Sequence, residues 1–310
     1  MAVLLANRVP ETEYSVEEGA LRILTELHIP FDLIDRQDPL SSYQLLILPD
    51  EIYFDRELTE KVQAFLKNGG KIIATCHSGL NEQKTGFALD FGLEYHGEME
   101  YTPIFMQIED AKEAGIEPMK YVSRYGSTKV SAQGASVFSS VWTPYFNRTY
   151  DNFSSHRHFP YDKKTDFAAI AQYQNIVYIA APVFGTYIEY GEALWRQLIA
   201  LAMQKLHYCP KVCSDLPLHC EVMVRQQPGR TIIHVLNYFY QRKSRQMDIV
   251  DSMISLYNRH IRLRSETAPK QVYLAPQNTP CTFEMRDGYC EVLVPELSGH
   301  TMVVLEWKEA

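Results

Sequence analysis

The sequence predicts an α/β domain with a parallel sheet over residues 1–210, followed by a small antiparallel β-sandwich domain over residues 211–310. In the first part, short apolar runs alternate with amphipathic segments of helical spacing. Beyond Lys211 this pattern gives way to short alternating runs separated by turn residues. Because strands joined by helices need crossover connections, the first pattern favours a parallel sheet, whereas the second is typical of antiparallel hairpins. We therefore place the domain boundary at residue 210.

The first hundred residues contain four apolar runs with the length of buried strands, namely Ala2–Leu5, Phe31–Ile34, Leu45–Leu48 and Lys71–Thr75. A capping box formed by Ser15 and Glu18 predicts a helix that Pro30 ends. A second amphipathic helix begins near Leu58 and ends at Gly69-Gly70. Helices of this length between the strands predict a flavodoxin-like sheet with helices on both faces.

Residues 97–167 interrupt this regularity, because aromatic side chains crowd in and helical spacing weakens. We expect an elaborated insertion with short strands here. Regular elements return with a strand at Ile176–Ala180 and a helix over Ala193–Leu206, which Pro210 closes.

The last hundred residues predict hairpins. Strands at Glu221–Val224 and Thr231–Leu236 flank Pro228-Gly229, and strands at Cys281–Glu284 and Tyr289–Val294 flank Asp287-Gly288. Two further strands are expected, at Gln271–Leu274 and Thr301–Glu306.

Composition excludes several classes of protein. With 46% hydrophobic residues the chain is too apolar for disorder, and a formal net charge of -8 without a basic block argues against nucleic acid as a partner. The apolar runs all fall short of the ~20 residues of a membrane span. Six cysteines are too few for a disulfide scaffold, so we expect a cytoplasmic protein. Neither a phosphate-binding loop nor a dinucleotide fingerprint occurs, and we predict no cofactor.

Several segments together carry a family resemblance: Ile47–Asp50, Phe65–Lys71, Ser78–Asn81, Phe153–Pro160, Ile176–Tyr187, His234–Tyr238 and Val294–Glu306. In this order they resemble the β-galactosidase trimerisation domain and the small β-domain that follows it. The trimerisation domain has a class I glutamine-amidotransferase-like fold and follows the catalytic barrel in glycoside hydrolase family 42 β-galactosidases and related α-L-fucosidases.

The resemblance implies a role as well as a fold. A catalytic (β/α)₈ barrel needs roughly 250 residues of its own, and the matched segments leave no room for one here. We therefore expect a non-catalytic, homo-oligomeric region, a trimer by resemblance, that accompanies a glycosidase barrel in the same or a neighbouring chain. In such an assembly the aromatic insertion borders a neighbouring active site, where His156, Arg157 and His158 contact sugar hydroxyls. A stand-alone carbohydrate-binding relative that has lost its barrel is a further alternative.

A different alternative makes the chain a thiol enzyme. The predicted strand Lys71–Thr75 ends on Cys76-His77, which resembles the nucleophile elbow of PfpI-like enzymes. In that hypothesis Cys76 is the nucleophile, His77 the base, and Glu17 or Glu18 a supporting carboxylate. An elbow of this kind prefers glycine two residues before and after the nucleophile, where this sequence has Ala74 and Ser78. The residues after Ser78 also lack helical spacing, so the sequence favours a packed thiol.

Histidine and cysteine also gather near the domain boundary, at His207, Cys209, Cys213, His219 and Cys220. Their spacing lacks the paired C-x₂-C knuckles of zinc sites. His156 and His158 offer two imidazoles on an extended segment, with no third ligand marked by spacing. We therefore predict no metal site at either place.

Overall fold

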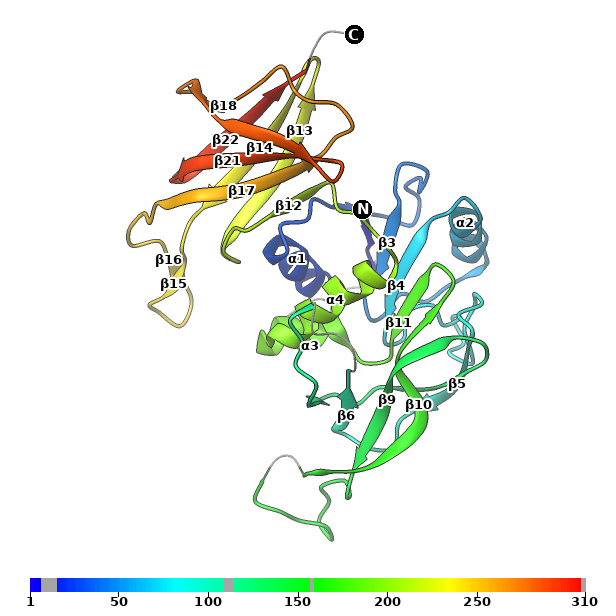
Figure 1. The fold of residues 1–310 in the computed structure, drawn as a ribbon. Coiled ribbons are helices and arrows are strands. Elements are labelled where there is room, and N and C mark those ends of the chain that lie inside the picture. Colours follow the sequence, from blue (N-terminus) through cyan, green and yellow to red (C-terminus); the bar gives the residue numbers. More distant parts are fainter. Residues whose placement is uncertain (7–15, 109–113, 157–158, 308–310) are drawn as a thin grey trace. The chain divides into compact units, whose positions relative to one another are not determined.

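The structure is a computed structural model and describes residues 1–6, 16–108, 114–156 and 159–307 (Figure 1). The contacts between Cα atoms divide it into two compact units. The first unit comprises residues 1–21 and 31–209, and the second residues 22–30 and 210–310. Both units are therefore discontinuous in sequence, whereas the sequence pattern predicts one continuous domain over residues 1–210.

A nine-stranded sheet forms the centre of the first unit, in the order β2-β1-β3-β4-β11-β10-β9-β6-β7. Its first five strands are parallel to one another: Asp32–Ile34 (β2), Ala2–Leu4 (β1), Leu45–Leu48 (β3), Lys71–Thr75 (β4) and Ile176–Ile179 (β11). All residues of β1, β3 and β11 are buried, which explains why these strands appear as continuous apolar runs in the sequence.

The helices of the first unit cover both faces of the parallel strands. Arg56–Lys67 (α2) lies on one face, and Val183–Tyr190 (α3) and Ala193–Lys205 (α4) lie on the other (Figure 1). Leu58, Val62 and Phe65 of α2 join one core cluster with alternate residues of the strands. Helix α1 (Val16–Glu26) begins where the capping box predicts a helix, although Ser15 itself lies outside the described residues. Helix α3 is not predicted from the sequence, because its eight residues are too few to establish the apolar spacing of a helix.

Four antiparallel strands extend the sheet: Tyr161–Tyr173 (β10), Ser136–Pro144 (β9), Ile104–Gln107 (β6) and Lys120–Ser123 (β7). The expectation of only short strands in this region is wrong, because β10 has 13 residues and β9 has nine. Register shifts interrupt their pairing and break the two-residue alternation by which a strand is recognised in a sequence. A separate pair, Leu93–Glu98 (β5) with Thr128–Ala132 (β8), packs near β10.

The second unit contains two larger antiparallel sheets. One has Val212–Ser214 (β12), Leu256–Arg264 (β17), Tyr289–Leu297 (β21) and Thr282–Arg286 (β20). The other has Cys220–Gln227 (β13), Arg230–Asn237 (β14), Gly299–Glu306 (β22), Gln271–Ala275 (β18) and Thr279–Pro280 (β19). Gln241–Arg242 (β15) and Asp248–Ile249 (β16) form a small ribbon. Buried side chains from both larger sheets share one core cluster, and both predicted hairpins form.

Candidate functional site

Asp50 and Cys76 each follow one of two neighbouring parallel strands. Asp50 follows β3 and Cys76 follows β4, so the carboxyl ends of both strands bring them to one edge of the sheet. Both have a left-handed backbone conformation, with φ of 36° at Asp50 and 49° at Cys76, which is strained for residues with a Cβ atom. Strained residues of this kind cluster at functional sites, which makes this edge of the sheet a candidate site.

A chain of polar contacts leads from the Cys76 thiol to a carboxylate. The Sγ atom of Cys76 lies 3.5 Å from Nδ1 of His77, and Nε2 of His77 lies 2.8 Å from Oε1 of Glu98 on β5. The carboxylate of Glu98 also accepts a hydrogen bond of 3.2 Å from the Tyr95 hydroxyl. Because Glu98 accepts at Nε2, the proton of a neutral His77 belongs on Nε2, which leaves a lone pair on Nδ1 toward the thiol.

The carboxylate that supports His77 is therefore Glu98, and the prediction of Glu17 or Glu18 is wrong in this respect. Oε1 of Glu17 instead accepts a hydrogen bond of 2.9 Å from the backbone N–H of Ala6. Glu98 lies 21 residues from His77 in the sequence and reaches it only because β5 pairs with β8. No local spacing in the sequence signals such a contact.

Electrostatics at this edge oppose a thiolate. Burial raises the pKa of the Cys76 thiol well above its usual value, and the negative charges of Asp50 and Glu98 raise it further. Only 5% of Cys76 is exposed. The pKa of Glu98 lies below its usual value. Partial burial raises this pKa, but the hydrogen bond that Glu98 accepts from His77 and the electrostatic attraction of His77 outweigh that effect. Glu98 is thus charged at neutral pH, which disfavours a second negative charge on Cys76.

Backbone N–H groups at the amino end of α3 donate to the Asp50 carboxylate. Reactive thiolates commonly lie at the amino end of a helix, where free N–H groups stabilise negative charge. At α3 these groups serve Asp50: Oδ1 accepts from Val183 at 3.0 Å, and Oδ2 accepts from Gly185 at 2.8 Å. The Thr75 hydroxyl donates to Oδ1 at 2.6 Å. Residues 77–92, which follow Cys76 and are all described, contain no helix.

Burial raises the pKa of Asp50 to about 6 from its ordinary value of 3.8, against the lowering effect of the hydrogen bonds from Gly185, Thr75 and Val183. The carboxyl group therefore acts as an internal cap of α3 and ties that helix to β3 and β4. The signal in the sequence is an acidic residue two positions after a buried strand, since Asp50 follows Leu48 with only Pro49 between them.

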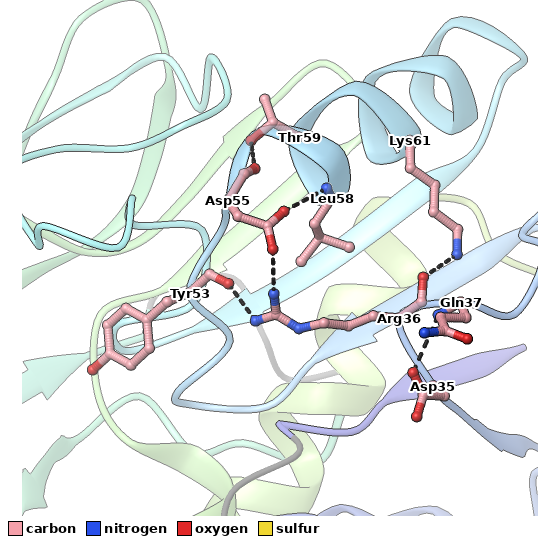
Figure 2. A network of polar contacts seen from close by, with 8 residues as sticks. All are labelled: Asp35, Arg36, Gln37, Tyr53, Asp55, Leu58, Thr59 and Lys61. Carbon is pink, nitrogen blue, oxygen red and sulfur yellow. Dashed lines mark hydrogen bonds and ion pairs between the residues drawn. The ribbon is translucent and has the colours of Figure 1, made fainter.

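A polar network holds the turn that carries Tyr53, whose ring stacks on His77 (Figure 2). Arg36, which follows β2, donates to Oδ2 of Asp55 at 2.9 Å and to the carbonyl oxygen of Tyr53 at 2.7 Å. Asp55 also caps α2 by accepting from the N–H of Leu58 at 2.8 Å. These contacts hold the turn that places the Tyr53 ring 6.3 Å from the His77 ring, with an interplanar angle of 19°.

The loop between β9 and β10 is a second candidate, because three of its aromatic side chains are exposed to solvent, whereas Phe146 packs against the buried Phe159. Tyr150 is 98% exposed, Phe153 69% and Tyr145 61%. The guanidinium of Arg148 lies 4.9 Å from the centre of the Phe153 ring. The predicted residue His156 is exposed on the same loop, whereas Arg157 and His158 lie outside the described residues. Figure 1 shows the loop at the far end of the long β9–β10 hairpin.

Of the histidines and cysteines near residue 210, His219 and Cys220 share one side-chain partner. His219 Nε2 lies 3.0 Å from Oδ1 of Asn237, and the buried thiol of Cys220 donates to the same oxygen at 3.8 Å. Among the described residues, no group of three or more His, Cys, Asp or Glu side chains is placed to hold a metal ion. Likewise, no helix in the described ranges is long and apolar enough to cross a membrane.

Comparisons with known proteins address the family. Residues 21–102 match the β-galactosidase trimerisation domain. The whole fold is similar to α-L-fucosidase isoenzyme 2 from Paenibacillus thiaminolyticus, with a TM-score of 0.93 and 30% identity over 99% of this chain and 48% of that chain. This chain thus spans about half the length of that relative. No curated protein matches in sequence.

Two β-galactosidases share the fold at lower identity. The enzyme from Rahnella sp. R3 has a TM-score of 0.61 and 14% identity over 98% of this chain and 40% of that chain. A catalytic mutant of a GH42 β-galactosidase from G. stearothermophilus has a TM-score of 0.59 and 17% identity over 98% and 40%. The resemblance found in the sequence is confirmed: residues 21–102 match the β-galactosidase trimerisation domain, and the fold of the chain is similar to part of an α-L-fucosidase.

Proposed function

We propose that this chain is the non-catalytic oligomerisation region of a glycoside hydrolase of the β-galactosidase or α-L-fucosidase type. The observation that carries this proposal is the unequal coverage of the fucosidase, in which 99% of this chain corresponds to only 48% of the relative. The remainder of that relative has the length that a catalytic barrel requires. Within the described residues the parallel strands form an open sheet, as in an amidotransferase-like or flavodoxin-like domain, and the last hundred residues suit a β-sandwich.

The properties of Cys76 support a non-catalytic role. The thiol has a histidine neighbour, but burial and two nearby carboxylates hold it in the protonated form. The α3 helix end that would stabilise a thiolate is occupied by Asp50. A PfpI-like enzyme using Cys76 and His77 is therefore the second candidate function. It predicts rapid, selective alkylation of Cys76, whereas the proposed role predicts slow alkylation.

The exposed aromatic loop supports the oligomeric part of the proposal. Large apolar side chains in one exposed segment are unusual on a monomer and are typical of interaction surfaces. Tyr145, Tyr150 and Phe153 meet this description, and the adjacent His156 adds a hydrogen-bonding group. We propose that this loop contacts a second copy or a glycosidase barrel at the rim of its sugar site, with Arg157 and His158 contributing beside His156. The assembly as a whole is expected to be a cytoplasmic trimer.

The experiment is the molar mass of the purified chain by sedimentation equilibrium across a wide concentration range. We expect three times the chain mass of 35.8 kDa. A monomer at the highest concentration would contradict the proposal. In the double variant Tyr150→Ser/Phe153→Ser we expect the oligomer to dissociate at a higher protein concentration than in the wild type. Tyr257→Ser is the matched control, because Tyr257 is 59% exposed on the second unit.

A separate assay addresses the border of the sugar site. In the assembled enzyme, His156→Ala and His158→Ala are expected to weaken substrate binding while the oligomer stays intact. Unchanged substrate affinity in both variants would remove these histidines from the proposal but leave the oligomeric role in place.

A further inference from the structure

A groove of about 350 Å³ lies at the edge of the parallel sheet opposite Cys76. The last turns of α2 form one of its sides, and the tight turn between β10 and β11 forms another. The carbonyl oxygen of Asn175, a residue that lines the groove, accepts a hydrogen bond of 2.8 Å from the N–H of Ile72 in β4. The volume is at the lower end of the roughly 300–1,000 Å³ that is usual for small-molecule sites. The Cys76 site contributes no residue to it.

One aromatic residue, Tyr173, lines this groove. The ring of Tyr173 packs against Gly92, where an added Cβ atom would lie only 2.5 Å from Cδ2 of the ring. A Cβ atom at Gly134 would lie 3.7 Å from Cε2. Two glycines thus let the backbone approach one edge of the Tyr173 ring more closely than residues with a Cβ atom would allow. Buried Leu89 and Ile176 extend the apolar surface of the groove beside the ring.

Polar side chains surround this apolar surface. Gln63 and Lys67 come from α2, and Gln174 and Asn175 come from the turn before β11. None of these four side chains forms a hydrogen bond with another described residue. The fifth, Asp90, accepts one hydrogen bond of 2.9 Å from the N–H of Gly92. Three amides, one cation and one anion therefore face the groove with most of their hydrogen-bonding capacity unused, and their formal charges cancel.

We infer that this groove is a second binding site, for a neutral pyranose sugar. A pyranose has an apolar face of C–H groups, which suits the Tyr173 ring and its apolar surroundings, and a rim of hydroxyls, which suits amides that donate and accept. Charge complementarity disfavours the other common small ligands, because a phosphate or a nucleotide needs an excess of positive charge and Lys67 is balanced by Asp90. Clefts with few, convergent polar groups around an apolar surface are typical of ligand sites.

The inference rests on the proposed function only in the choice of probes, which are methyl β-D-galactopyranoside and methyl α-L-fucopyranoside. Saturation-transfer NMR and titration of the purified protein measure their affinities. We expect at least one probe to bind with a Kd in roughly the millimolar range, as is common for a shallow site. Tyr173→Ala is expected to weaken binding about tenfold or more, and Tyr173→Phe to retain it. Tyr257→Ala is the control for an exposed tyrosine elsewhere.

A second variant keeps the test decisive if Tyr173→Ala fails to fold. Gln63 and Lys67 are exposed helix residues, so Gln63→Ala/Lys67→Ala is expected to fold normally and still weaken binding. No saturation by either probe in the wild type, or equal affinity in the double variant and wild type, would overturn the inference. Sedimentation of the same samples separates this result from the proposed function, because oligomerisation does not require an occupied groove.

Discussion

The carboxyl edge of the parallel sheet and the β9–β10 loop use their side chains in opposite ways. At the edge, Asp50, Thr75 and Cys76 are buried, and their polar groups are paired with backbone or side-chain partners. On the loop, Tyr150 and Phe153 expose apolar rings that a folded monomer would ordinarily bury. The groups that resemble an active site therefore hold the fold together. The exposed rings of the β9–β10 loop contribute least to the fold and are available to a partner. We therefore place the function on this loop.

The largest effect that would sharpen this comparison is expected from Asp50→Ala. The substitution removes the acceptor of the Val183 and Gly185 N–H groups in a buried site, and it leaves the Thr75 hydroxyl only its longer contact, 3.4 Å to the Leu48 carbonyl oxygen. We expect a loss of about 3–4 kcal/mol in the free energy of unfolding, measured by urea denaturation. The control Asp166→Ala removes an exposed carboxylate and is expected to change stability by less than about 0.5 kcal/mol. Equal stability of both variants would mean that Asp50 does not anchor α3.

The pH dependence of stability gives the next largest effect. Because burial raises the pKa of Asp50 to about 6, the folded state binds its proton more tightly than the unfolded state, whose pKa is near 3.8. The contribution of this group to stability is therefore full below about pH 4 and falls as the pH rises to about 6. The stability of the wild type relative to Asp50→Asn is expected to fall by about 2–3 kcal/mol over this range. A constant difference between the two proteins from pH 4 to 7 would contradict the raised pKa.

Alkylation rates distinguish a packed thiol from a nucleophile. At pH 7 we expect iodoacetamide to label Cys76 at least about tenfold more slowly than the exposed Cys209, because burial raises the pKa of Cys76 and limits access. Peptide mass spectrometry after short labelling times measures both rates in one sample. Faster labelling of Cys76 than of Cys209 would break the comparison and favour the cysteine enzyme.

The smallest effect is expected for the loop. In the dissociated protein, Tyr150→Ser/Phe153→Ser removes rings that are 98% and 69% exposed, so the free energy of unfolding should change by less than about 0.5 kcal/mol. Urea denaturation at concentrations below the dissociation midpoint measures this. A loss of more than about 2 kcal/mol would show that the rings pack within the chain, which would remove the argument that they are kept for a partner.

The spacing of apolar residues and the residue types at turns are local properties of the sequence, and they determined much of the fold. The buried strands β1, β3 and β4 and helices α2 and α4 appear in the sequence as apolar runs and as apolar residues at helical spacing. The hairpins at Pro228-Gly229 and Asp287-Gly288 were predictable from their turn residues. The resemblance to a trimerisation domain likewise depends on short motifs in a fixed order, which survive without any knowledge of contacts.

Contacts across long stretches of chain were decided only by the tertiary structure. His77 and Glu98 meet because β5 pairs with β8, and Asp50 meets the end of α3 across 133 residues. The long strands β9 and β10 were not predicted, because register shifts in their pairing break the alternation of buried and exposed residues. Sequence patterns record which side of an element is buried, whereas the partner of a polar group depends on which elements the fold brings together. For that reason the sequence placed Cys76 beside His77, and the tertiary structure showed that Asp50 holds the helix end on which an active thiolate would depend.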